Sequence, residues 1–166
     1  MPAYRLQTLL EMRERAEEAA KQAFSEAVQV FEAEKKKLEQ MRADLTRRQQ
    51  ERKEKVLAYR MSVLSSNALQ ANSFEQFERF EQRLKEEEAQ VELEMVAQEG
   101  EVKRAKQRME QRRMEMAEAA KEKKAIEKHK EQWAKQVRYE RQMREELVQE
   151  EIGNTLHLKR KREGKS

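Results

Sequence analysis

Residues 73–152 read SFEQFERFEQRLKEEEAQVELEMVAQEGEVKRAKQRMEQRRMEMAEAAKEKKAIEKHKEQWAKQVRYERQMREELVQEEI, a stretch with one glycine, Gly100, and no proline. Apolar residues recur in it at the alternating three- and four-residue spacing of a coiled-coil heptad. One line of this seam consists of Phe77, Leu84, Val91, Ala105, Ala119, Ile126, Trp133 and Leu147. The interleaved line consists of Phe74, Met95, Val102, Met109, Met116 and Val137. A mean period of 3.5 residues predicts one long helix packed against another in a left-handed coiled coil.

The composition agrees with this interpretation. Charged residues make up 42% of the 166 residues and hydrophobic residues 37%, with one proline and three glycines. Such a composition with a heptad repeat is typical of a long helix or coiled coil, not of a globular domain with a wide core. High charge with few aromatic residues also occurs in disordered chains. The sustained seam favours the coiled coil.

Several classes of function and location are disfavoured by what the sequence lacks. There is no cysteine, which leaves no disulfide, thiol nucleophile or cysteine zinc site. No signal peptide and no membrane-length apolar run is present, so we expect a cytoplasmic protein. There is no glycine-rich phosphate loop, and His129 and His157 stand apart from each other. We therefore expect no enzyme activity, no cofactor, no bound metal and no small-molecule substrate.

A second apolar stripe precedes the long helix and predicts a helix over residues 4–64. Its members are Leu6, Leu10, Ala16, Ala20, Ala23, Ala27, Val30, Phe31, Leu38, Met41, Leu45, Val56, Tyr59 and Val63. Charged residues interrupt this stripe around Glu34 and again over residues 48–52. We expect the helix to be more loosely packed or more exposed at these two interruptions.

A turn is predicted over residues 65–73, which carry no charge but contain three serines and two asparagines. Ser73 with Gln76 fits a capping box for a helix over residues 74–152. The sequence therefore predicts an all-α fold, an antiparallel two-helix coiled-coil hairpin over residues 1–158 in which the second helix is longer. The alternative is an unbroken helix that pairs in parallel with a second copy.

The hairpin predicts a register in which the numbers of facing residues add up to about 137, because both helices rise equally per residue. The expected layers are Val63 with Phe74, Val56 with Glu81, Met41 with Met95, Val30 with Met109, and Leu6 with Trp133. Beyond Trp133 the second helix has no partner in its own chain. The apolar residues there, Val137, Leu147, Val148 and Ile152, therefore predict contact with another protein.

The C-terminus is strongly basic. Gly153 and Asn154 are interpreted as a helix stop, followed by a disordered tail over residues 159–166. Five basic residues against Glu163 account for the excess positive charge of the whole chain, +4. Such a tail is typically a solvated end, although it could bind anionic lipid or nucleic acid. Without interleaved aromatic residues, we expect no nucleic-acid binding.

Aromatic residues suggest two docking surfaces. Phe74 and Phe77 fall on the seam next to the turn, whereas Phe80 lies beside it, which would expose an apolar patch close to the turn with Tyr59 and Leu84 nearby. Trp133, the only tryptophan, is either a seam residue that closes the hairpin or an anchor for a partner.

Three stretches resemble a known family. The opening YRLQTLLEMR (4–13), the stretch HKEQW (129–133) and the ending EEIGN (150–154) with its basic tail are similar to type III secretion stalk proteins of the YscO type, which are related to flagellar FliJ. The resemblance covers nearly the whole chain.

The resemblance implies a non-enzymatic, monomeric antiparallel coiled coil at the inner-membrane export apparatus. Its paired termini enter a hexameric secretion ATPase and its turn points to the export gate, with secretion chaperones as further partners. Carried over by position, the ATPase-binding residues are Leu6, Leu10, Arg13, Trp133, Val137, Leu147 and Ile152. The gate-binding residues are Tyr59, Phe74, Phe77, Phe80 and Leu84. The alternative function is a homodimeric coiled-coil spacer without a motor partner.

Overall fold

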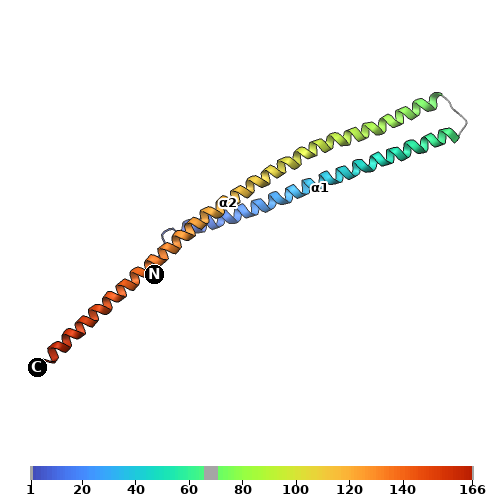
Figure 1. Ribbon diagram of the computed structural model, residues 1–166. Helices are drawn as coiled ribbons and strands as arrows, with labels where there is room; N and C mark the ends of the chain where they lie inside the picture. Colours follow the sequence, from blue (N-terminus) through green and yellow to red (C-terminus); the bar gives the residue numbers. More distant parts are fainter. Residues whose placement is uncertain (1, 66–70, 166) are drawn as a thin grey trace. The chain divides into compact units, whose positions relative to one another are not determined.

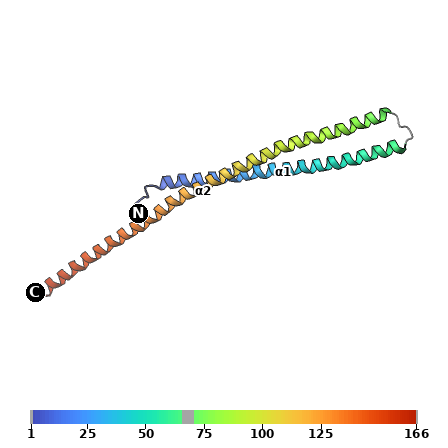
Figure 2. The same cartoon turned by 45° about the horizontal axis from the view of Figure 1, so that its top comes forward.

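The computed structural model describes residues 2–65 and 71–165. It contains two helices, α1 (Gln7–Ser65) and the longer α2 (Ala71–Glu163) (Figure 1). Residues cluster into two compact units, Lys21–Glu115 and Met1–Ala20 with Met116–Ser166. In each unit α1 and α2 pack against each other, and Figure 2 shows them side by side from a second direction. The predicted all-α hairpin with a longer second helix is confirmed.

The contacts between the helices confirm the antiparallel register. In one unit Arg52 pairs with Glu88 and Tyr59 stacks on Phe77. In the other, Lys130 donates a hydrogen bond to Gln7 at 2.8 Å. The residue numbers in each pair add up to about 137, as equal rise along the two helices requires. The alternative of one unbroken helix is wrong.

The core is a narrow seam with one side chain per layer on each helix. Leu38 is buried, and Ala105 is the most buried residue described, at 1% exposure. A methyl group at a seam position allows the opposite backbone to approach closely. Val30 is exposed, so the predicted layer of Val30 with Met109 is wrong. The half-buried positions there are Ala27, Val28 and Phe31.

Two polar layers occupy the interruptions of the apolar stripe. Glu88 and Gln98 of α2 are buried, at 8% and 4% exposure. Arg52 Nε donates to Glu88 Oε1 at 2.6 Å, and Gln98 Nε2 donates to the Glu34 carbonyl oxygen at 3.0 Å. The prediction of loose or exposed packing at Glu34 and residues 48–52 is wrong, because each polar side chain finds a partner on the other helix. Buried polar groups that are hydrogen-bonded in this way favour one register over its neighbours.

The helix ends differ from the prediction. Residues 66–70 of the predicted turn lie outside the described residues, but α2 already begins at Ala71, so Ser73 is not its N-cap. At the other end α2 runs through Gly153 and Asn154 to Glu163, so the predicted stop and the disorder of residues 159–163 are wrong. Extending an existing helix adds one hydrogen bond per residue, which outweighs the cost of a single glycine. Arg160, Lys161 and Arg162 in the last turn also interact favourably with the helix dipole.

Replacing Gly100 by alanine is expected to raise the free energy of unfolding by about 1 kcal/mol, the difference in helix propensity. The added methyl group would meet only the Arg104 guanidinium, at 3.8 Å. Thermal melting followed by circular dichroism measures the effect. Gly153→Ala is the matched comparison, since nothing lies within 4 Å of its added methyl group. It should raise the helical signal and change the main transition less, and an unchanged melting temperature for Gly100→Ala would contradict the expectation.

Candidate functional site

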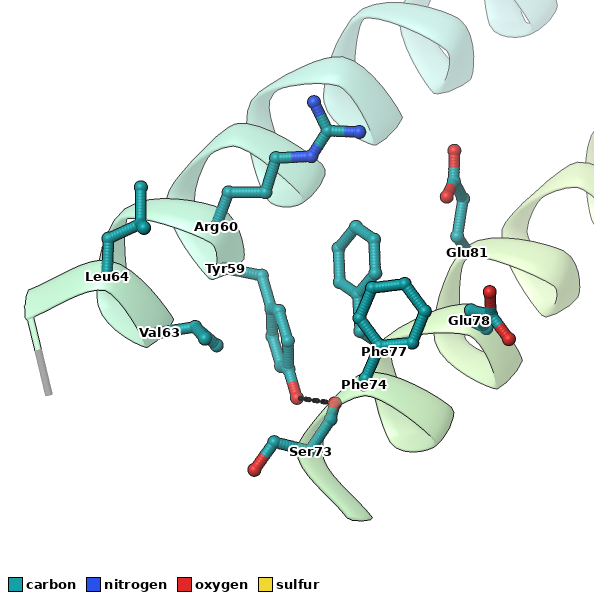
Figure 3. Close-up of a pocket in the computed structure, with 9 residues that line it drawn as sticks. All are labelled: Tyr59, Arg60, Val63, Leu64, Ser73, Phe74, Phe77, Glu78 and Glu81. Atoms are coloured by element: carbon teal, nitrogen blue, oxygen red, sulfur yellow. Dashed lines mark hydrogen bonds between the residues drawn. The ribbon is translucent and has the colours of Figure 1, made fainter. Parts of the chain in front are cut away.

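An apolar groove lies between the two helices where α1 ends and α2 begins; we call it the tip groove. It measures about 500 Å³. Figure 3 shows its lining residues, Tyr59, Arg60, Val63, Leu64, Ser73, Phe74, Phe77, Glu78 and Glu81.

Tyr59 of α1 organises the tip groove. Its ring stacks on Phe77 and Phe80 of α2, with centroid distances of 5.0 Å and 6.2 Å. Its hydroxyl donates a hydrogen bond to the Ser73 carbonyl oxygen at 3.2 Å (Figure 3). Arg60 lies over the Phe77 ring, with its guanidinium carbon 5.8 Å from the centroid. One tyrosine therefore joins both helices through ring contacts and a hydrogen bond.

The exposed apolar residues here are not all those predicted. Phe74 is 67% exposed, whereas Phe80 is half-buried against Tyr59, the reverse of the expected placement. Leu84 is a half-buried residue that lines a separate, mainly polar groove with Arg48 and Glu88. An exposed stripe of Leu57, Met61 and Leu64 on α1 was missed. Its four- and three-residue spacing was the available signal.

The chain termini form a second candidate surface, which we call the terminal clasp. It consists of Tyr4, Gln7, His129, Lys130 and Trp133. The buried Tyr4 ring packs on Trp133, with centroids 5.1 Å apart, and its hydroxyl lies 2.7 Å from His129 Nδ1. Lys130 Nζ lies 6.0 Å from the Tyr4 ring centroid. Trp133 therefore closes the paired region of the two helices by packing on the Tyr4 ring.

The predicted ATPase-binding residues divide into two groups. Leu10 is buried in the seam, and Arg13 forms an ion pair with Glu122. Nearby, a hydrogen bond to Glu17, 2.8 Å away, holds the pKa of Lys123 above its usual value. Leu6 and Trp133 are half-buried. These residues therefore hold the termini together and offer little free surface.

The remaining members lie at or beyond the end of the paired region. Val137 is half-buried, and residues 138–163 of α2, which we call the C-terminal arm, are all exposed. The arm carries seven large apolar side chains in contact with solvent: Tyr139, Met143, Leu147, Val148, Ile152, Leu156 and Leu158. Seven large apolar side chains exposed to solvent on one helix indicate an interaction surface.

Replacing Tyr4 by alanine is expected to open the terminal clasp and shift the fluorescence of Trp133 to longer wavelength, since the indole loses its ring contact. Trp133 is the sole tryptophan, so the signal reports this site alone. Tyr4→Phe is the matched control, because it keeps the ring and loses only the hydroxyl contact, at a cost of about 1 kcal/mol. An identical emission spectrum for Tyr4→Ala would mean that Tyr4 does not shield Trp133.

The described part of the chain shows no group of three or more histidine, aspartate or glutamate side chains that could hold a metal ion. Over residues 2–65 and 71–165, no helix has the length and apolar character needed to cross a membrane.

The sequence profile of the YscO-like protein family matches residues 1–163. The chain belongs to the YscO-like family. Among solved structures it is similar to CT670 from Chlamydia trachomatis, a protein described as a candidate YscO homolog, with a TM-score of 0.80 and 21% sequence identity. The similarity covers 98% of this chain and 99% of CT670, and it concerns the fold. No curated protein matches the chain in sequence.

Membership of the YscO-like family makes the chain a structural, non-enzymatic component of a type III secretion system, with partners in the secretion apparatus. The tip groove and the C-terminal arm both expose apolar side chains in the described part of the chain.

Proposed function

We propose that this YscO-like chain is the central stalk of its secretion system, working as a single hairpin in the cytoplasm at the inner-membrane export apparatus. The C-terminal arm and the terminal clasp enter a hexameric secretion ATPase, and the tip groove contacts the export gate. Secretion chaperones are further partners. The observation that carries the proposal is the C-terminal arm, a regular helix that has seven exposed apolar side chains and packs against no other helix in the described part of the chain.

The arm suits insertion into a ring. Leu147, Val148 and Ile152 are each more than half exposed, so burying them in a channel would remove apolar surface from water at about 25 cal/mol per Å². The terminal clasp keeps the N-terminus beside α2 through the contact of Tyr4 with Trp133. Both termini would therefore be presented to the ATPase together.

The tip groove suits a different partner. Its exposed Phe74 and Leu64 border an apolar hollow whose floor is fixed by Tyr59 and Phe77. A preformed apolar hollow with a rigid aromatic floor accepts an apolar side chain of a partner at little ordering cost. We assign this groove to the export gate.

Titration into purified secretion ATPase tests the proposal. The intact chain should bind the ATPase and raise its rate of ATP hydrolysis. Leu147→Asp with Ile152→Asp should abolish this response, because it places two charges where apolar contact is needed. Leu57→Asp with Met61→Asp is the matched control, with the same chemistry at equally exposed positions next to the tip groove.

The control variant should activate the ATPase normally. In a pull-down with the cytoplasmic part of the export gate, Phe74→Asp should reduce capture and the arm variant should not. A chain that neither binds nor activates the ATPase would overturn the proposal. If both double variants lost activation equally, the C-terminal arm would not be the surface that binds the ATPase.

A further inference from the structure

α2 carries a second heptad line on the face turned away from α1, which we call the outer seam. It follows four- and three-residue steps through Ala89, Leu93, Val96, Gly100, Lys103, Gln107, Glu110 and Met114. Leu93 and Val96 are each 66% exposed and Met114 is 72% exposed. The inner seam of α2 is covered by α1, whereas the outer seam faces solvent. A heptad line with exposed aliphatic residues offers a surface to another helix.

Charge along the outer seam is divided into two blocks. Residues 86–101 contain seven glutamates and no lysine or arginine. Residues 103–113 contain six basic residues and one glutamate. The change of sign falls at Val102, inside one continuous helix. A helix with an acidic half and a basic half is complementary to a copy of itself that runs in the opposite direction.

We propose that two copies of this chain associate through their outer seams, antiparallel, about a two-fold axis near Val102. The two lines interlock when the numbers of facing residues add up to about 203, since seam positions of alternating spacing then meet in layers. Ala89 of one copy lies against Met114 of the other, and Val96 against Gln107. Gly100 lies against the aliphatic stem of Lys103, and Leu93 against that of Glu110. Small residues face long ones, so the helices approach closely.

The residues that flank the outer seam make the pairing specific. One heptad position beside it is occupied in turn by Glu92, Glu99, Lys106 and Arg113, all exposed. In the antiparallel dimer Glu92 meets Arg113 and Glu99 meets Lys106, and symmetry repeats each pair. In a parallel dimer in register each of these residues would instead face the position five residues further on. Glu92 would then meet Ala97 and Lys106 would meet Gln111, so fewer of the four residues would meet an opposite charge.

The ion pairs that these residues form within one copy do not prevent them from forming ion pairs with a second copy. Glu99 pairs with Arg42 of α1 at 3.4 Å, and both side chains are more than half exposed. Arg113 pairs with Glu110, one helical turn away, at 3.7 Å. Solvent-exposed ion pairs of this kind contribute little to stability, so replacing them with pairs across the dimer costs little. Half of the layers contain a charged residue, so the dimer is weak and depends on salt.

Sedimentation of the full chain over a range of concentrations tests the dimer. We expect a monomer–dimer equilibrium whose dissociation constant rises about tenfold between low and high salt, as screening of four ion pairs predicts. Glu92→Lys and Arg113→Glu should each weaken the dimer about tenfold or more. The double variant Glu92→Lys with Arg113→Glu should restore it, because the charges are exchanged and the pairing is kept. A monomer at every concentration, or a double variant no better than the singles, would overturn the proposal.

Cross-linking tests the direction and the register. The chain has no cysteine, so single cysteines report single positions. Lys103→Cys, next to the two-fold axis, should form a disulfide-linked dimer. Ala89→Cys is the matched control, because its two copies would lie roughly 38 Å apart at 1.5 Å per residue. Ala89→Cys mixed with Met114→Cys should link the two variants to each other.

Equal linking of Ala89→Cys and Lys103→Cys, each to itself, would indicate a parallel dimer and overturn the antiparallel one. Circular dichroism checks that each variant keeps its helices. The inference extends beyond the proposed function, in which one hairpin occupies the ATPase. ATPase activation by the Glu92→Lys variant is expected to be unchanged. Sedimentation therefore tests the dimer, and ATPase activation tests the stalk role independently of it.

Discussion

Replacing Glu88 by alanine is expected to lower the free energy of unfolding by about 3 kcal/mol, because it leaves the Arg52 guanidinium buried without its partner. Only 22% of the Arg52 side chain and 10% of the Glu88 side chain are exposed, and their closest atoms are 2.6 Å apart. Removing one member of a buried charge pair costs more than the pair itself contributes. Chemical denaturation followed by circular dichroism measures the change.

Glu87→Ala is the matched control for Glu88. Glu87 is adjacent in the chain, but its side chain is about half exposed, and its carboxylate lies 3.9 Å from Arg48. Its removal should change stability by less than about 1 kcal/mol. Replacing both Arg52 and Glu88 by leucine should recover most of the loss, since an apolar layer needs no charge partner. Similar effects of Glu87→Ala and Glu88→Ala would mean that the polar layer does not stabilise the hairpin.

Replacing Leu38 by alanine is expected to destabilise the hairpin by about 2 to 3 kcal/mol, from lost burial and the cavity that remains. Leu38 is one of the four buried apolar residues in the described part of the chain. A two-helix seam has no neighbouring layer of helices that could move in to fill the gap. Urea denaturation measures this change as a shift of the denaturation midpoint, provided that the dependence of the unfolding free energy on urea concentration is the same in both proteins.

Leu57→Ala serves as the control for Leu38, because it makes the same chemical change on the same helix at a side chain that is mostly exposed. Its expected effect is within about 0.5 kcal/mol. If Leu57→Ala lowered the free energy of unfolding as much as Leu38→Ala, the Leu57 side chain would be covered in solution, by residues of the same chain or by a second molecule.

The fold could be predicted because a coiled-coil hairpin is encoded locally. Each seam repeats every seven residues, and an uncharged stretch separates the two seams in the sequence. The register followed from the position of that stretch alone, and contacts such as Lys130 with Gln7 agree with it. What periodicity could not show is how a polar residue on the seam is satisfied. Arg52 lies in one of the interruptions of the first apolar stripe, and only the packing of the two helices pairs it with Glu88.

The candidate sites were predicted in position more than in detail. Tyr59 and Phe77 do form the aromatic floor of the tip groove. Phe80 was expected to be exposed, yet the Tyr59 ring reaches past the seam to cover it. Tyr4 lies within the predicted helix over residues 4–64, but α1 begins only at Gln7, so the heptad spacing does not describe where the Tyr4 side chain lies. The predicted helix stop at Gly153 is wrong for a different reason, because the glycine is visible in the sequence, whereas the long helix that propagates through it to Glu163 is a property of the folded chain.

The spacing of the cross-helix contacts along the chain has a consequence for the order of folding. Tyr59 and Ser73 are separated by 14 positions, Arg52 and Glu88 by 36, and Tyr4 and His129 by 125. Closing the longest of these loops directly would cost about 2 kcal/mol more chain entropy than closing the shortest. Folding should therefore nucleate beside the turn and proceed as a zipper, with the termini joining last and separating first. Amide hydrogens near Tyr4 and Leu10 should then exchange with solvent faster than those near Leu38, even in the native protein.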